Sequence, residues 1–222
     1  DGAARPVTSD LRHATGLLPT SVRPVVMGVL NVTPDSFSDG GLALTEDGTP
    51  ERALAVGRAL AAAGADCVDV GGESTRPGAE PIPVDVELAR VVPVVAGLVA
   101  DGIVVSVDTR HAAVARAALD VGAAIVNDVG GLAPDPGMLE AVASAGAGYV
   151  IMHLRGEPRT MQDDPRFDDV VAEVEAELLS ARAGAIAAGV AADAVALDPG
   201  IGFGKTLAHN LELLAAVPRL VG

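Results

Sequence analysis

Six polar residues that could bind a ligand stand at the ends of six short apolar runs. They are aspartates, asparagines and one histidine, and glycine, proline or threonine usually follows within three positions: Asn31, Asp69, Asp108, Asn127, His153 and Asp198. Carboxylates accept hydrogen bonds and amides both accept and donate, so together they suit a ligand edge rich in N–H groups and acceptors. A single such residue is equally typical of a helix cap or turn. Six in succession favour a binding site.

Two loops rich in glycine, proline and small polar residues follow the first two apolar runs. Residues 31–41 (NVTPDSFSDGG) carry one phenylalanine, and residues 71–79 (GGESTRPGA) carry one arginine. Paired glycines let the backbone approach a ligand closely. The guanidinium of Arg76 is suited to phosphate oxygens. We expect both loops to cover a site, although ordinary turns with a solvated arginine are the alternative.

Lys205 is the single lysine of the chain and lies in a glycine-rich segment. Gly204, Lys205 and Thr206 end like a nucleotide-binding P-loop, but that motif needs a glycine five positions before Gly204, where Pro199 stands. We therefore reject nucleotide hydrolysis. Lys205 is interpreted either as a functional residue or as a solvated residue at the start of a helix.

The elements that must position these residues alternate between strands and helices. Strands are predicted at residues 25–30, 66–70, 103–107, 123–126, 148–152 and 194–197. Helices are predicted at residues 50–63, 84–100, 110–121, 136–144, 167–188 and 207–220. The alternation indicates βαβ units with a parallel sheet, whose strands carry their site at the carboxyl ends. Left-handed glycines are expected to turn the chain from four helices toward the next strands: Gly64, Gly122, Gly146 and Gly189.

Length and composition fit a single domain with a sizeable core. Half of the 222 residues are apolar and only four are aromatic, so alanine and branched aliphatic side chains must fill the core. The net charge of −15 argues against nucleic acid as a partner. Neither a membrane span nor a signal peptide is expected, and the default location is the cytoplasm. Cys67 stands alone, which excludes an intrachain disulfide and a cysteine-based metal site; we expect it to be a buried filler.

The two loops, in their order and spacing, resemble the signature segments of dihydropteroate synthases. The resemblance continues through residues 106–109 (SVDT), 127–129 (NDV), 152–153 (MH) and 197–205 (LDPGIGFGK). It implies a (β/α)8 TIM barrel, of which about six of the eight βα units are present. Residues 25–222 are therefore expected to form a pterin-binding barrel domain lacking its last two units, after an extension at residues 1–24. On this interpretation the chain is either truncated or the partial sequence of a longer protein.

The resemblance implies a transferase of folate biosynthesis. In this family the amine of p-aminobenzoate displaces pyrophosphate from 6-hydroxymethyl-7,8-dihydropterin diphosphate, giving 7,8-dihydropteroate. Matched residue by residue, the carboxylates and the amide expected in the pterin slot are Asp108, Asn127 and Asp198. The other expected substrate-binding residues on these segments are Val129 and Met152 on the ring, Phe203 near the opening, and Lys205.

The resemblance also implies roles for the two loops. Asn31 corresponds to a ligand of Mg²⁺, the expected cofactor, and would also contact substrate. Arg76 would steady the departing diphosphate and, with Asp35 and Asp108, belongs to the expected catalytic residues. The p-aminobenzoate pocket, the target of sulfonamides in this family, would include Phe37, Thr75, Arg76 and Pro77.

Two alternatives differ in class from this interpretation. A non-catalytic paralogue would keep the pterin-binding barrel as a binding module, but it should have lost some of the site residues, and none is lost here. An inactive fragment is the other form of this alternative, and the truncated chain itself is expected to bind pterin weakly or not at all. A pterin-dependent methyltransferase would share the carboxylates but would have no reason to carry the two loops. The full-length protein is expected to be a homodimer that binds small-molecule substrates.

Overall fold

Six parallel strands alternate with helices in the computed structural model, which describes residues 24–33, 50–74 and 79–220. The strands are β1 (Met27–Asn31), β2 (Cys67–Gly71), β3 (Val105–Asp108), β4 (Ile125–Asp128), β5 (Gly148–Met152) and β6 (Val195–Asp198). The α-helices are α1 (Glu51–Ala62), α2 (Val84–Ala100), α3 (Ala112–Asp120), α4 (Met138–Ala145), α5 (Val170–Ala187) and α6 (Leu207–Leu220). A short 3-10 helix, η4 (Ala192–Ala194), precedes β6.

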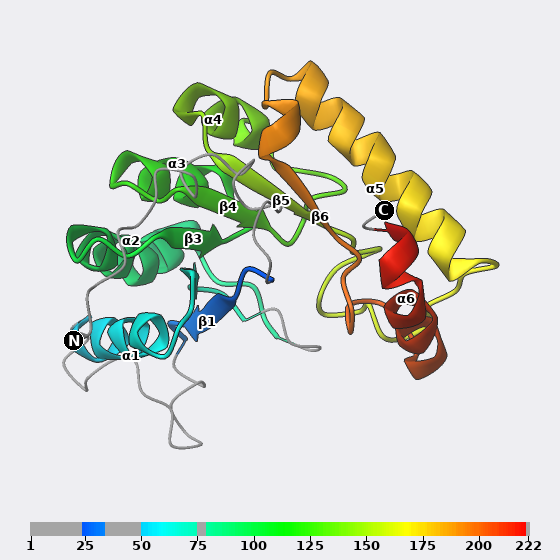
Figure 1. Ribbon diagram of the computed structural model, residues 1–222, viewed down its shortest axis with the longest axis horizontal. Helices are drawn as coiled ribbons and strands as arrows, with labels where there is room; N and C mark the ends of the chain where they lie inside the picture. Colours follow the sequence, from blue (N-terminus) through cyan, green and yellow to red (C-terminus); the bar gives the residue numbers. More distant parts are fainter. Residues whose placement is uncertain (1–23, 34–49, 75–78, 221–222) are drawn as a thin grey trace.

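The strands form one sheet in the order β1-β2-β3-β4-β5-β6, and every neighbouring pair is parallel. Figure 1 shows helices α1 to α4 stacked along one side of this sheet, and α5 packs beside β5 and β6 with α6 next to it. Within the described residues, β1 and β6 each pair with one strand only, so the sheet is open there. The prediction of six consecutive βα units is confirmed.

A left-handed glycine follows four of the helices and begins the connection to the next strand, as predicted. The φ angles of Gly64, Gly122, Gly146 and Gly189 are 107°, 104°, 60° and 102°. Other residue types are strained in this region of backbone space, whereas glycine adopts it freely. The recurring glycine therefore marks the point where each of these helices gives way to the next strand.

Two strands extend beyond the polar residue that was predicted to end them. β2 continues to Gly71, so Asp69 lies within the strand, and β4 continues from Asn127 to Asp128. The reason is pairing, because Gly71 is held between Asn31 of β1 and Asp108 of β3. The prediction that Asp69 and Asn127 are the final strand residues is therefore wrong. β2 ends two residues after Asp69, and β4 ends one residue after Asn127.

Small aliphatic side chains fill the core between the sheet and its helices. Helices α1 and α2 approach closely because each offers a glycine to a leucine of the other. A Cβ on Gly57 would lie 2.7 Å from Leu98 Cδ2, and a Cβ on Gly97 would lie 2.5 Å from Leu54 Cδ2.

Cys67 is a free, buried thiol, and burial raises its pKa to about 12. Its predicted role as a buried filler is confirmed.

No helix in the described part of the chain combines the length and the apolar character needed to cross a bilayer.

Candidate active site at the carboxyl ends of the strands

The parallel register places four of the predicted site residues on one face of the sheet. Asn31 pairs with Gly71, Gly71 with Asp108, and Asp108 with Asn127. Paired residues of parallel strands point to the same face, so these side chains form one row across β1 to β4. Asn127 pairs with Val150, and Met152, two residues further along β5, pairs with Asp198. Asp198 therefore lies on the same face, one step closer to the strand ends.

Asp108 occupies the middle of this row in strongly negative surroundings. Burial raises the pKa of its carboxyl group well above the usual value, and the charges of Asp69, Glu87, Asp128 and Glu73 raise it further. A Cβ on Gly71 would lie 3.1 Å from Asp108 Oδ2, so a larger residue there would crowd the carboxylate. A carboxylate in such a field is stabilised by any positive charge that develops beside it.

Asp69 lies one step deeper on the same face. Asn127 Nδ2 donates a hydrogen bond of 2.9 Å to Asp69 Oδ2, and burial raises the pKa of the Asp69 carboxyl group. Ser106, the register partner of Asp69, is also fully buried. Because the amide of Asn127 is oriented by Asp69, its oxygen and second N–H are left for a ligand. Asp69 was recognised from sequence as a strand-end residue, and its support of Asn127 was missed.

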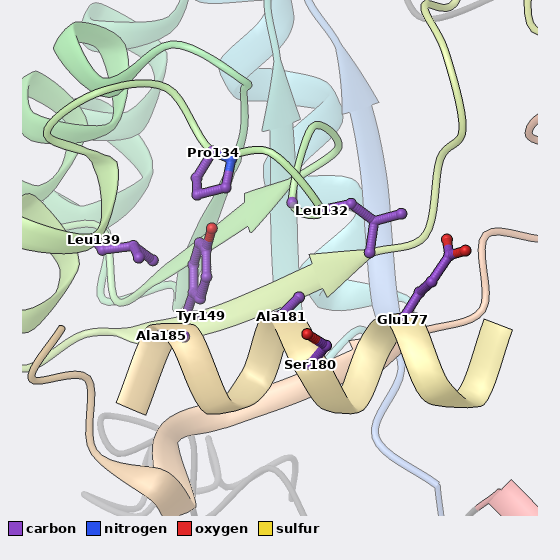
Figure 2. Close-up of a pocket in the computed structure, with 10 residues that line it drawn as sticks. Leu132, Pro134, Leu139, Tyr149, Glu177, Ser180, Ala181 and Ala185 are labelled. Carbon is purple, nitrogen blue, oxygen red and sulfur yellow. The ribbon is translucent and has the colours of Figure 1, made fainter. Parts of the chain in front are cut away.

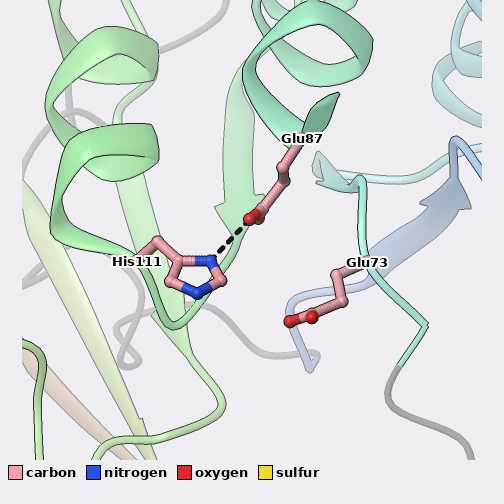
Figure 3. Close-up of side chains that lie close together, drawn as sticks. All are labelled: Glu73, Glu87 and His111. Carbon is pink, nitrogen blue, oxygen red and sulfur yellow. Dashed lines mark hydrogen bonds and ion pairs between the residues drawn. The ribbon is translucent and has the colours of Figure 1, made fainter. Parts of the chain in front are cut away.

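A second group of residues that sequence analysis missed surrounds the β3–α3 turn. Glu87 is fully buried, and its carboxylate contacts Thr109 Oγ1 at 2.7 Å and His111 Nδ1 at 2.7 Å. Figure 3 shows Glu87 and His111 in contact with Glu73 nearby. Glu73 forms a two-pronged ion pair with Arg110, with N–O distances of 2.9 and 3.1 Å. The spacing of apolar residues in the sequence could have shown that Glu87 is buried. Glu87 shares the core-facing positions of α2 with four aliphatic residues: Val91, Val94, Val95 and Leu98.

The cluster of Glu73, Glu87 and His111 has ligand atoms within 4.8 Å of one another. A cation there would have to displace the Arg110 guanidinium from Glu73 and compete with the Thr109 hydroxyl on Glu87. Both carboxylates already have charged or hydrogen-bonded partners in the structure. The cluster is therefore interpreted as a hydrogen-bonded charge network.

Lys205 is buried below the loop that follows β6. Its ammonium group donates to Phe203 O at 2.9 Å and to His153 O at 3.3 Å, and it lies 3.0 Å from His153 Nδ1. Burial lowers the pKa of Lys205 to about 8. The alternative of a solvated lysine is wrong, because the side chain is only 3% exposed.

His153 connects Lys205 to helix α5. Its Nε2 lies 3.1 Å from Glu177 Oε2, and Glu177 also pairs with Arg155. With Lys205 donating to Nδ1, the neutral ring carries its proton on Nε2 and donates it to Glu177. Burial, followed by the charge of Lys205, lowers the pKa of His153 to about 4.

The pKa of His153 predicts that acid destabilises the protein. The folded pKa lies below the ordinary 6.5, so the unfolded chain binds a proton that the native state rejects. Stability contributed by the neutral ring is complete above pH 6.5 and is lost as pH falls toward 4, at about 1.4 kcal/mol per unit. Between pH 7 and pH 4.5 the unfolding free energy of the wild type should fall by about 2–3 kcal/mol more than that of His153→Gln.

Urea unfolding at several pH values measures this difference. His209→Gln is the matched control, because His209 lies beside the same Phe167 ring. Its unfolding is measured at the same pH values as that of the wild type. A His153→Gln variant with the wild-type pH dependence would contradict the assignment of a neutral buried ring.

The remaining predicted residues lie near the strand ends or outside the described residues. Met152 and Val129 are buried, and Phe203 is half-buried. Asp198 Oδ1 accepts a 2.8 Å hydrogen bond from Gly200 N, which ties this carboxylate to the loop that carries Phe203. Five predicted residues lie outside the described residues: Asp35, Phe37, Thr75, Arg76 and Pro77.

A pocket of about 530 Å³ lies on the opposite face of the sheet. Figure 2 shows it between helix α5 and the segment that follows β4, with Leu132, Leu139, Tyr149 and Ala181 among its walls. Tyr149 pairs in register with Val126, the neighbour of Asn127 that points the other way. The pocket is therefore separated from the polar row by the sheet itself.

Comparison with known proteins identifies the family of the chain. A family model described as pterin binding enzyme matches residues 27–221. The chain belongs to this family. A dihydropteroate synthase of Mycobacterium leprae is 53% identical over 203 residues, which cover 90% of this chain and 70% of that protein. The resemblance to dihydropteroate synthases seen in the sequence is thereby confirmed.

Solved structures of the family agree with the fold. A Xanthomonas albilineans dihydropteroate synthase with 4-aminobenzoic acid superposes with a TM-score of 0.79 at 48% identity, covering 90% of this chain and 69% of that one. A Burkholderia cenocepacia dihydropteroate synthase complexed with 7,8-dihydropteroate gives a TM-score of 0.77 at 43% identity, covering 90% and 66%. The fold is that of the dihydropteroate synthase TIM barrel, and the six described βα units form an open part of it.

Proposed function

We propose that the polar row of Asn31, Asp108 and Asn127, with Asp198 beside it, carries out the dihydropteroate synthase reaction. The reactants are 6-hydroxymethyl-7,8-dihydropterin diphosphate and p-aminobenzoate, and the products are 7,8-dihydropteroate and pyrophosphate. The observation that carries the proposal is the register, which gathers these side chains on one face at the strand ends. Membership of the pterin-binding family and the ligands of its relatives support it.

The polar row is suited to the edge of a pterin ring. Asp108 and Asp198 accept from ring N–H groups, while Asn127 can accept and donate. Its orientation by Asp69 makes this recognition selective, because a ligand lacking a partner atom would leave the amide buried and unpaired. Met152 and Val129 offer apolar contact to the ring faces, and Phe203 stands on the loop beside Asp198.

The chemical step needs stabilisation of separating charges. The bond between the pterin methylene carbon and the diphosphate oxygen breaks, and its electron pair leaves with pyrophosphate. The amine nitrogen of p-aminobenzoate forms the new bond to that carbon and loses a proton. Positive charge develops on the pterin methylene during this exchange, and the buried carboxylate of Asp108 stabilises it.

Mg²⁺ is the cofactor that we propose for the leaving group. Asn31 fits this role, because its side chain is exposed at the end of β1 and an amide oxygen is a hard ligand. Bound Mg²⁺ would neutralise negative charge on the diphosphate. Arg76, Asp35 and the p-aminobenzoate contacts of Phe37, Thr75 and Pro77 remain predictions from the resemblance.

Turnover of the full-length protein tests both the reaction and the metal ligand. We expect dihydropteroate to form in the presence of Mg²⁺, and Asn31→Ala to raise the Mg²⁺ concentration for half-maximal rate about tenfold or more. Val29→Ala is the matched control, since Val29 lies two residues earlier on the same face of β1 and carries no metal-binding group. No dihydropteroate from the wild type would overturn the proposed function. Unchanged Mg²⁺ dependence in Asn31→Ala would remove Asn31 from the metal site.

The protein is also proposed to be a cytoplasmic homodimer that does not bind nucleic acid. One cysteine in 222 residues is typical of a reducing compartment. The charge of −15 repels polyanions. The homodimer remains a prediction from the resemblance.

A further inference from the structure

Glu87 is a buried carboxylate that the reaction scheme does not use. It lies in the first turn of α2 and has no exposed surface, although the positions that share its helix face are aliphatic. Burying an ionised group is unfavourable unless specific partners compensate for the lost hydration. An aliphatic residue would fill this position at lower cost to stability. The partners of Glu87 therefore indicate why a carboxylate stands here.

Those partners belong to the segment that directly follows Asp108. Thr109 Oγ1 donates to Glu87 Oε1 at 2.7 Å and accepts from the backbone N–H of His111 at 3.1 Å. His111 Nδ1 contacts the second carboxylate oxygen at 2.7 Å. The backbone N–H of Thr109 also donates to Asn127 O at 3.1 Å. Both oxygens of Glu87 thus hold the turn that fixes the end of β3.

The same helix turn holds the loop after β2. A Cβ on Gly72 would lie 3.0 Å from Glu87 Cγ, so the glycine lets this loop rest directly on Glu87. Arg90, three residues further along α2, donates to Gly72 O at 2.9 Å. Glu73 of this loop pairs with Arg110 of the β3–α3 turn at 2.9 Å. The start of α2 therefore contacts both segments that flank Asp108.

We propose that Glu87 is a positioning residue of the active site, which fixes Asp108 through Thr109 and His111 and adds negative charge behind it. The inference rests on the proposed function, because it assigns Asp108 the stabilisation of the pterin methylene. Glu87 itself would not touch the substrate. Its role is to keep the Asp108 carboxylate in place and in a field that favours a cation.

The charge of Glu87 makes the role measurable. Among the described residues, the groups whose charges raise the pKa of Asp108 are Asp69 of β2, Asp128 of β4, Glu73 of the β2 loop and Glu87 of α2. Removing the charge of Glu87 should lower the pKa of Asp108. Activity that requires the Asp108 carboxylate would then persist to lower pH. A purely structural role would leave this acidic limb unchanged.

The test compares Glu87→Gln, Glu87→Leu and the control Asp85→Asn in the full-length protein. Glutamine keeps the shape and can still accept from Thr109, whereas leucine removes both contacts. Asp85 is an exposed carboxylate in the same helix turn, and its loss should change neither kcat nor the pH profile. We expect Glu87→Gln to shift the acidic limb of kcat to lower pH. We expect Glu87→Leu to lower kcat tenfold to a hundredfold (about the loss caused by a misplacement near 1 Å) with KM for p-aminobenzoate within about twofold.

Two outcomes would overturn the inference. One is a wild-type kcat and pH profile in both variants. The other is a kcat decrease that parallels loss of folded protein in urea, with no shift of the acidic limb in Glu87→Gln. Failure of the proposed function is a separate result, since the wild type itself would then form no dihydropteroate.

Discussion

Asp108→Asn is expected to lower kcat by about two to three orders of magnitude while the protein stays folded. Asparagine has nearly the same shape but cannot offset positive charge on the pterin methylene. The same substitution should not lower the unfolding free energy at neutral pH. The folded pKa of Asp108 is raised, so the native carboxylate is less favourable than the unfolded one, and that cost is incurred as pH rises above the ordinary value of 3.8. At neutral pH the variant should therefore resist urea at least as well as the wild type.

Turnover measures the loss of kcat, and urea unfolding measures stability. Calorimetric titration with pterin diphosphate and Mg²⁺ measures binding of the pterin substrate. Calorimetry with Asp108→Ala should show loss of pterin binding. Asp120→Asn is the matched control, because Asp120 ends helix α3 of the same βα unit, far along the chain from the strand end. It should leave turnover and binding unchanged. Equal pterin binding by Asp108→Ala and the wild type would remove Asp108 from the site.

Gly200→Ala is expected to be the most disruptive single methyl group that can be added to the site loop. Gly200 has a φ of +65°, and its Cβ would lie 2.1 Å from the backbone oxygen of His153. That oxygen accepts from Lys205, so the loop after β6 and the end of β5 cannot separate without breaking a buried hydrogen bond. We expect a decrease of about 2–5 kcal/mol in unfolding free energy, from left-handed strain and overpacking together.

Gly202→Ala separates the two causes. Gly202 has a φ of +86°, but a Cβ there would meet nothing within 4 Å. It should therefore show only the backbone strain, about 1–2 kcal/mol. Urea unfolding of both variants gives the comparison, and turnover should fall much further in Gly200→Ala because only that methyl group forces the loop away from His153. Equal stability of the two variants would contradict the close contact between Gly200 and His153.

The succession of strands and helices was predictable because its causes are local. Short β-branched runs form strands, longer stretches with apolar residues at helical spacing form helices, and glycines at positive φ separate them. The predicted ranges of α2, β5 and α6 agree with the structure, and the other elements differ by one to three residues at their ends. The family was predictable for a related reason, since its motifs follow strand ends in a fixed order.

Pairing between strands was not predictable in the same way. A strand end is set by the neighbour that continues to pair with it, which is why β2 reaches Gly71 and β4 reaches Asp128. The same pairing brings Asn31, Asp108 and Asn127 into one row although they are far apart in the sequence. Sequence could predict that these residues lie at strand ends, and only the register decided that they share a face.

The sequence by itself determined the element order, the family and the polar residues at the strand ends. Tertiary structure decided which charged residues are buried: Glu87 inside α2, Asp69 below Asn127, and Lys205 against His153. The physical reason is that a buried charge is tolerated only where partners from other elements compensate for lost hydration. Those partners lie 22 residues away for Glu87 and 52 for Lys205, beyond the reach of any local pattern.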